Sequence, residues 1–205
     1  MSGPRVAVLD YGIGNLRSAA KALQHVGAAA RLVTEAGDVE AADAVVLPGV
    51  GAFGACAQAL RESGLEAPAR EAIAAGVPFF GVCVGFQMLY ESSVESPGAR
   101  GLGVFSGAVK PLPAGVKHPQ MQWNVLESAG TDAPALLEGL GLRPWVYFVH
   151  SFAPPVGTET VAVCDYGGRV AAMANQGALW GAQFHPEKSG AAGLALLANF
   201  VAQAA

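Results

Sequence analysis

The sequence is poor in charged residues and in cysteine, and each shortage argues against a class of protein. Charged side chains make up 14% of the 205 residues, whereas ordinary domains carry about 25%. The 12 lysines and arginines are scattered among 16 acidic residues, so a basic nucleic-acid-binding face is not expected. The three cysteines, Cys56, Cys83 and Cys164, lack C-x-x-C spacing, which argues against a disulfide framework and a cysteine zinc site.

Long hydrophobic runs and targeting signals are also missing. The least polar stretch, residues 190–205, contains Asn199 and Gln203 and falls short of the ~20 residues that span a bilayer. The first five residues do not resemble a signal peptide, so we expect a cytoplasmic protein without a membrane segment. Because the chain is 52% hydrophobic over 205 residues, we expect residues 1–205 to form one domain.

The first half of the chain alternates between strand and helix patterns. Short apolar runs predict buried strands at 5–9, 44–47 and 78–82. Apolar periodicity predicts helices at 16–26, 56–62 and 66–75, and one more from beyond Cys83 to about Glu91. This alternation is typical of right-handed crossovers in a mostly parallel open sheet with helices on both faces.

The second half consists of short strand patterns, several of them joined by turn signals such as Asn175-Gln176-Gly177. The patterns cover 104–112, 121–126, 145–148, 161–164, 169–174 and 179–183. We interpret them as an antiparallel extension of the same sheet, closed by a helix at 193–203. The predicted fold class is therefore α/β, with a single domain.

Cys83 lies in a Gly-x-Cys-x-Gly motif, between Gly81 and Gly85, at the end of a predicted strand. This motif is the cysteine counterpart of the nucleophile elbow, a sharp strand-to-helix turn in which a Cβ at the glycines would clash. The turn places the sulfur at the start of a helix, where unpaired N–H groups and the dipole stabilise negative charge. The alternative is a buried core cysteine, and the spacing alone does not decide between the two.

A base for this cysteine is offered by the sequence His185-Pro186-Glu187. Pro186 favours extended geometry at His185, and residues i and i+2 of an extended chain project to the same side. The imidazole and the carboxylate then form the base and orienting group that a thiol nucleophile needs. Taken alone, this sequence is more typical of a capped surface loop; beside an elbow cysteine, it favours catalysis.

A glycine-rich loop, residues 48–54, follows the strand at 44–47. Such a loop can offer backbone N–H groups to an oxyanion without interference from side chains. A phosphate-binding P-loop is excluded because no Gly-Lys-Ser/Thr follows. A flexible connector remains the alternative interpretation.

Together these motifs resemble the class I, triad-type glutamine amidotransferases, and among them the glutaminase subunits of imidazole glycerol phosphate synthases. The resemblance covers nearly the whole chain. Gly-x-Cys-x-Gly and His-Pro-Glu are typical of the superfamily, and the opening Asp-Tyr-Gly-x-Gly-Asn and Tyr-Phe-Val-His-Ser of these subunits. The matching segments are 10–15, 48–54, 81–87, 147–152 and 184–190.

The resemblance implies a flavodoxin-like fold and a glutaminase that needs neither cofactor nor metal. Cys83 would attack glutamine, His185 would act as base and acid, and Glu187 would orient His185. Ammonia would pass to a cyclase partner with a (β/α)8 barrel, in a heterodimer that serves histidine biosynthesis. The residues implied to hold glutamine are Gly49, Val50, Gly51, Gln87, Glu95, Val149, His150 and Ser151. The residues implied to face the partner are Asn15, Trp123, Tyr147 and Lys188.

The chain departs from the family pattern at the segment usually written His-x-Gly-Trp-Asn, which here reads Gln-Met-Gln-Trp-Asn at 120–124. His118 and Gln122 are therefore given no role. Two alternative functions are weighed: a glutaminase subunit for pyridoxal phosphate or anthranilate synthesis, and a dinucleotide-binding module. The second has Gly12-x-Gly14 after the first strand, but Arg17 occupies the third glycine position of that fingerprint.

Overall fold

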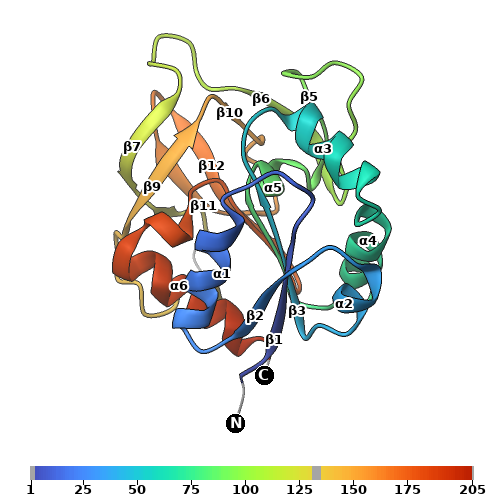
Figure 1. Ribbon diagram of the computed structural model, residues 1–205. Helices are drawn as coiled ribbons and strands as arrows, with labels where there is room; N and C mark the ends of the chain where they lie inside the picture. The colour runs from blue at the N-terminus through green and yellow to red at the C-terminus, as the bar shows by residue number, and fades with distance from the viewer. Residues whose placement is uncertain (1–2, 131–134, 205) are drawn as a thin grey trace.

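A mixed sheet of eight strands runs through the middle of the protein (Figure 1). The computed structural model describes residues 3–130 and 135–204, so both ends of the expected domain, Met1, Ser2 and Ala205, lie outside the described residues. The strands are β1 (Arg5–Leu9), β2 (Ala29–Val33), β3 (Ala44–Gly49), β4 (Phe79–Cys83), β8 (Glu127–Ser128), β11 (Thr160–Asp165), β12 (Arg169–Gln176) and β13 (Leu179–Ala182).

The order of these strands separates a parallel half of the sheet from an antiparallel half. The order is β2-β1-β3-β4-β13-β12-β11-β8. Strands from β2 to β13 pair in parallel, and the pairs from β13 to β8 are antiparallel. The predicted parallel sheet with an antiparallel extension is confirmed for this part of the chain.

Helices cover both faces of the sheet. They are α1 (Leu16–His25), α2 (Ala36–Glu40), α3 (Phe53–Glu62), α4 (Glu66–Ala74), α5 (Val84–Gln87) and α6 (Gly190–Ala202), with short 3-10 turns η1 (Ala135–Leu137) and η2 (Pro186–Lys188). Figure 1 shows α1 and α6 together on one side of the sheet and α2, α3 and α4 on the other. The two-faced arrangement is therefore as predicted.

Two smaller sheets correct the prediction that every strand of the second half extends the main sheet. The strands β5 (Tyr90–Ser93), β6 (Phe105–Pro111) and β10 (Phe152–Ala153) form one sheet. The strands β7 (Gln120–Val125) and β9 (Trp145–His150) form an antiparallel ribbon. One face of the ribbon stays open to solvent, with Met121, Trp123 and Trp145 exposed at 63%, 47% and 57%.

The prediction of a helix from beyond Cys83 to about Glu91 is wrong after Gln87. Helix α5 ends at Gln87, and strand β5 begins at Tyr90. Tyr90 is fully buried, and its ring contacts those of Phe86 and Phe105. Burial of these rings stabilises a strand at a position where local periodicity favours a helix.

Two short elements, β2 and α2, were not predicted. Strand β2 is only five residues long and carries Arg31 at its centre, so its apolar pattern is weak. Helix α2 is also five residues long, with Val39 as its one buried side chain. Such short elements are stabilised by tertiary contacts. Strand β2 pairs with β1, and helix α2 packs on α4.

The parallel strands place four segments that follow them at one edge of the sheet. Strands β1, β3, β4 and β13 all run in the same direction. Their carboxyl ends lead into the segments at 10–15, 50–52, 84–87 and 183–189. In open α/β sheets, ligands bind at this edge, so the fold brings together the motifs that the sequence places far apart.

Candidate active site

Cys83 stands on a strained turn at the end of β4. Its φ is 57°, and among residues 3–130 and 135–204 it is the one non-glycine residue with positive φ. A Cβ at Gly85 would collide with the carbonyl of Leu47, and a Cβ at Gly81 would lie 2.8 Å from the carbonyl oxygen of Gly85. Because strain of this kind persists only where surrounding packing enforces it, the predicted elbow geometry is present at Cys83.

His185 reaches the same place from the adjacent strand. Strand β13 pairs with β4 in parallel, with Ala182 opposite Val82. His185 itself is extended, as predicted, but Glu187 lies in the 3-10 turn η2, not in extended chain. The turn still brings the two side chains together, with His185 Nδ1 2.9 Å from Glu187 Oε1. Both side chains are almost fully buried, at 3% and 4% exposure.

Burial and charge act in opposite directions on these two groups. Burial lowers the pKa of His185, but hydrogen bonds to Cys83 and Glu187 and the charges of both outweigh it and raise the pKa to about 9. Burial raises the pKa of Glu187, but His185 and Asn15 outweigh it and the net shift is downward. The pair therefore favours an imidazolium facing a carboxylate at neutral pH, beside the sulfur of Cys83.

Three polar residues that the sequence analysis did not connect to the triad support it. Asn15 Nδ2 donates to Glu187 Oε1 over 3.3 Å. Ser189 Oγ, buried at 2% exposure, donates to the carbonyl of His185 over 2.6 Å. Gln183 Nε2 lies 3.8 Å from Cys83 Sγ. The sequence analysis gave no role to Ser189 or Gln183. Their closeness to His185 in the chain is the signal that could have pointed to them.

A pocket of about 400 Å³ opens over Cys83 and His185. Most of the predicted glutamine-holding residues line it. These are Val50, Gly51, Gln87, Glu95, Val149, His150 and Ser151. The sequence analysis missed Val84, Pro119 and Phe152, which also line it. Such a pocket can enclose a small polar molecule.

Three predicted pocket residues differ in what they offer. Gly49 is opposite Cys83 in the β3–β4 register and packs against Gly85, so it shapes the elbow and does not line the pocket. The Gln87 amide already donates to the Phe152 carbonyl and to Gln183. Glu95 accepts from the N–H of Phe53 at the start of α3 through Oε2 over 2.8 Å, which orients its carboxylate at the pocket wall.

His150 contributes a ring that stays neutral. Its Nδ1 lies 2.9 Å from the Phe152 carbonyl, and its Nε2 is buried without a partner among the described residues. Burial, with a smaller opposing effect of Phe152 and a further lowering by His185, brings its pKa down to about 4. The ring is therefore uncharged at neutral pH, next to a pocket that holds an imidazolium.

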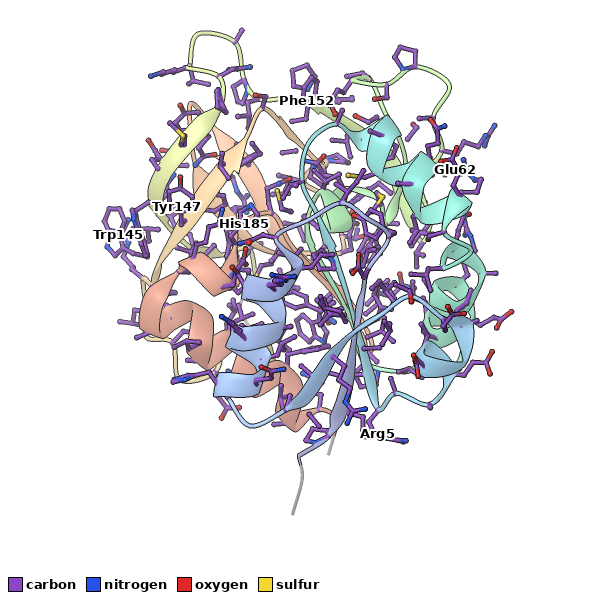
Figure 2. All side chains as sticks on the ribbon, in the orientation of Figure 1. Arg5, Glu62, Trp145, Tyr147, Phe152 and His185 are labelled. Atoms are coloured by element: carbon purple, nitrogen blue, oxygen red, sulfur yellow. The ribbon has the colours of Figure 1, made fainter. Side chains whose placement is uncertain are left out.

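The residues predicted to face a partner fall into two groups. Trp123, Tyr147 and Lys188 form a cluster, with the rings of Trp123 and Tyr147 6.1 Å apart and Lys188 Nζ 6.0 Å from the Tyr147 ring. Asn15, in contrast, is partly buried and is bonded to Glu187. In Figure 2, Trp145 reaches outward at the edge of the ribbon, whereas Tyr147 lies next to His185.

Other kinds of site find no support in the part of the chain that the structure describes. No group of three His, Cys, Asp or Glu residues could hold a metal ion there. No helix within residues 3–130 and 135–204 is long and apolar enough to cross a membrane. The three cysteines are free thiols and are buried.

The fold and the arrangement of Cys83, His185 and Glu187 define a class I glutamine amidotransferase. The profile of the family "Glutamine amidotransferase class-I" matches residues 7–204. A solved structure described as a glutamine amidotransferase superposes with a TM-score of 0.76 at 26% identity, over 97% of this chain and 98% of that one. PurLQS from Thermotoga maritima gives a TM-score of 0.75 at 20% identity, over 98% of both chains, and supports the fold alone.

Relatives of known name narrow the assignment. The chain is 48% identical to "Imidazole glycerol phosphate synthase subunit HisH" of Deinococcus radiodurans, over 97% of this chain and 94% of that one. It is 45% identical to the HisH subunit of Methanothermobacter thermautotrophicus, over 96% and 97% of the two chains. The HisH subunit of Synechococcus elongatus is 44% identical, over 100% and 95%. The chain therefore belongs to the HisH family of glutamine amidotransferases.

Proposed function

We propose that the protein is the glutaminase subunit of an imidazole glycerol phosphate synthase. It hydrolyses L-glutamine to glutamate and ammonia and delivers the ammonia to a cyclase partner in histidine biosynthesis. The observation that carries the proposal is the 2.9 Å contact of His185 Nδ1 with Glu187 Oε1, next to Cys83 on its strained strand-to-helix turn. A buried base with a fixed orienting group beside a thiol is what nucleophilic amide cleavage requires.

In the first half of the reaction, His185 takes the thiol proton of Cys83, and the resulting thiolate Sγ attacks the side-chain amide carbon of glutamine. A carbon–sulfur bond forms, and the carbonyl oxygen becomes an oxyanion. His185 then gives a proton to the amide nitrogen as the carbon–nitrogen bond breaks, so that neutral ammonia leaves and a γ-glutamyl thioester remains. Glu187 holds the imidazole with Nδ1 toward its carboxylate, which leaves Nε2 for the thiol and the leaving nitrogen.

In the second half, water attacks the thioester and His185 accepts its proton. The carbon–sulfur bond breaks, glutamate leaves, and the thiol is restored. Both tetrahedral intermediates carry an oxyanion, for which the backbone supplies donors. Val84, directly after Cys83, and Val50 and Gly51 of the loop line the pocket together with Cys83, so their backbone N–H groups are candidate donors. Removing one such donor typically costs about 10²–10³ in rate.

Recognition of glutamine combines charge with backbone contacts. Glu95 is oriented at the pocket wall, where its carboxylate can pair with the α-ammonium group. The strand segment 149–151 lines the other wall and can offer backbone groups to the α-carboxylate. Among the described residues, this pocket contains the polar groups that a free amino acid requires.

The proposed partner is a cyclase subunit with a (β/α)8 barrel. The surface of this chain that would contact the cyclase contains Trp123, Tyr147 and Lys188, and Lys188 also lines the pocket. Aromatic side chains exposed on one ribbon face are typical of interface centres. Contact here would close the pocket toward the partner, so that ammonia leaves into the cyclase before water protonates it. We place this complex in the cytoplasm, where a free catalytic thiol stays reduced.

Reconstitution tests the proposal. Glutamate release should be slow for the isolated chain and should rise when the cyclase and its nucleotide substrate are added, with one imidazole glycerol phosphate formed per glutamate. Exchange of the cyclase for a pyridoxal phosphate or anthranilate synthase subunit serves as the control and should give no rise. A rise with either of those partners instead would refute the assignment.

A further inference from the structure

Helix α3 begins without a side-chain cap of its own. Its N-cap residue is Ala52, whose side chain cannot accept a hydrogen bond. Two neighbouring residues of the turn after β5 bond the first N–H groups of the helix instead. Glu95 Oε2 accepts from the N–H of Phe53 over 2.8 Å. Ser96 Oγ accepts from the N–H of Gly54 over 3.0 Å. A turn that lies 42 residues further along the chain therefore caps α3.

This capping turn, residues 93–96, is closely fitted to the helix. Ser93 is 3% exposed, and its Oγ accepts from the N–H of Glu95 over 3.2 Å. Its carbonyl accepts from the N–H of Ser96 over 3.2 Å. A Cβ added at Gly54 would lie 2.8 Å from the Cβ of Ser96, so no side chain fits between the helix and the turn. A shift of Ser96 would therefore also shift Glu95.

The segment that follows the capping turn is bonded to α3 and α4 as well. Arg61 Nη2 donates to the carbonyl of Arg100 over 3.4 Å. Arg70 Nη1 donates to the carbonyl of Leu102 over 2.6 Å, and its Nη2 to that of Gly101 over 3.2 Å. The connection from β5 to β6 is thus held at both ends, and the capping turn is the end that reaches the pocket.

Glu95 is the residue through which the capping turn reaches the pocket. It lines the pocket together with Cys83. Its Oε2 is held at the N-terminus of α3, where the helix dipole favours a carboxylate. Its Oε1 accepts no hydrogen bond from the residues that the structure describes, so this oxygen remains for a ligand. A carboxylate that is already fixed loses little further side-chain entropy when it pairs with a ligand.

We propose that Ser96 is a positioning residue for the recognition of glutamine. Its bond to Gly54 holds the capping turn on α3, and the turn fixes the Glu95 carboxylate for the α-ammonium group of the substrate. Ser96 does not contact the substrate itself and acts through Glu95. This role rests on the proposed function and deepens it.

Two variants of the complex with the cyclase disturb the contact from opposite sides. Ser96→Ala removes the acceptor from the capping turn. Gly54→Ala keeps that acceptor but adds a Cβ that pushes Ser96 away from the helix, although alanine itself favours helix. Each variant should raise KM for glutamine about fivefold, which corresponds to about 1 kcal/mol of binding free energy, and should leave kcat unchanged.

A matched control and a double variant separate positioning from general damage to α3. Ser63 Oγ donates to the carbonyl of Leu60 over 2.9 Å at the opposite end of the same helix. Ser63→Ala therefore also removes one hydrogen bond of α3, but it should leave KM unchanged. In a Glu95→Ala background, Ser96→Ala should change kcat/KM by less than twofold, because no carboxylate is left to position.

The outcomes distinguish the role of Ser96 from the proposed function. An unchanged KM for Ser96→Ala or Gly54→Ala, a loss confined to kcat, an equal rise in KM for Ser63→Ala, or full additivity with Glu95→Ala would each overturn the role of Ser96. The unaltered complex tests the proposed function itself: if it releases no glutamate from glutamine, that function fails before any variant is compared.

Discussion

Asn15 and His185 converge on a single oxygen of Glu187. Asn15 Nδ2 lies 3.3 Å and His185 Nδ1 2.9 Å from Glu187 Oε1. Asn15 comes from the loop before α1 and Glu187 from the turn after β13, so the contact joins opposite ends of the sequence. The carboxylate that is proposed to orient the catalytic base is therefore itself held by the Asn15 amide.

This contact predicts a kinetic effect of Asn15→Ala. Loss of one hydrogen bond to the carboxylate loosens the orientation of the imidazole, which should lower kcat about three- to tenfold with little change in KM. Steady-state glutamate release in the cyclase complex measures it. Arg17→Ala, an exposed change on α1, is the control and should leave the rate unchanged; equal rates for Asn15→Ala and Arg17→Ala would show that Asn15 does not orient Glu187.

The titration of His185 provides a second prediction. The chain has four histidines, so ring signals in nitrogen-detected NMR are few enough to assign. His185 should titrate near pH 9 and His150 near pH 4, according to their pKa values. Glu187→Gln removes a charge that raises the pKa of His185, so the His185 midpoint should fall while that of His150 stays low. An unchanged midpoint for His185 would contradict the account.

The same pair makes stability depend on pH in a defined direction. His185 has a folded pKa of about 9 against 6.5 unfolded, so its stabilisation is complete below pH 6.5 and is lost as pH rises through 9. Glu187 has a lowered pKa, so its stabilisation is present above its ordinary value of 4.5 and is lost as pH falls. The difference in melting temperature between the unaltered chain and Glu187→Gln should be widest between about pH 4.5 and 6.5 and should narrow toward pH 9.

The elbow glycines predict a fourth result. A Cβ at Gly85 would strike the backbone carbonyl of Leu47, which is held in β3. Gly85→Ala should therefore lose about 3 kcal/mol of unfolding free energy, the upper end of what overpacking typically costs in a core. Gly37→Ala is the matched control, because nothing lies within 4 Å of a Cβ there and alanine favours helix α2. Urea unfolding should separate the two variants; similar stabilities would show that the turn can relax.

The aromatic surface predicts how the partner binds. Trp123 is 47% exposed and its ring lies against Tyr147. If this surface contacts the cyclase, Trp123→Ala should weaken the complex at least tenfold without lowering the melting temperature of the isolated chain. Val94→Ala, 50% exposed on another part of the surface, is the control. Titration calorimetry with the cyclase measures both, and equal affinities would place the interface elsewhere.

The sequence predicted the parts of the fold and site that depend on local chemistry. Gly81 and Gly85 around Cys83 predict the elbow because only glycine fits there, and parallel strands bring their carboxyl ends together whatever lies between them. His185 and Glu187 meet as expected, although through a 3-10 turn and not an extended segment.

What local patterns missed was determined by contacts between distant residues. The strand at Tyr90 forms because its ring packs on Phe105, and β7 and β9 leave the main sheet to pair with each other. The contact of Asn15 with Glu187 and the bond from Gly54 to Ser96 depend on loop geometry that no periodicity encodes.

The most direct test of the central claim is Cys83→Ala in the complete complex, assayed with two nitrogen sources. The account predicts that glutamine-dependent formation of imidazole glycerol phosphate is lost, because no thioester can form, while the ammonium-dependent rate equals that of the unaltered complex. Retained glutamine-dependent activity would contradict the assignment of Cys83 as the nucleophile and, with it, the account of this site.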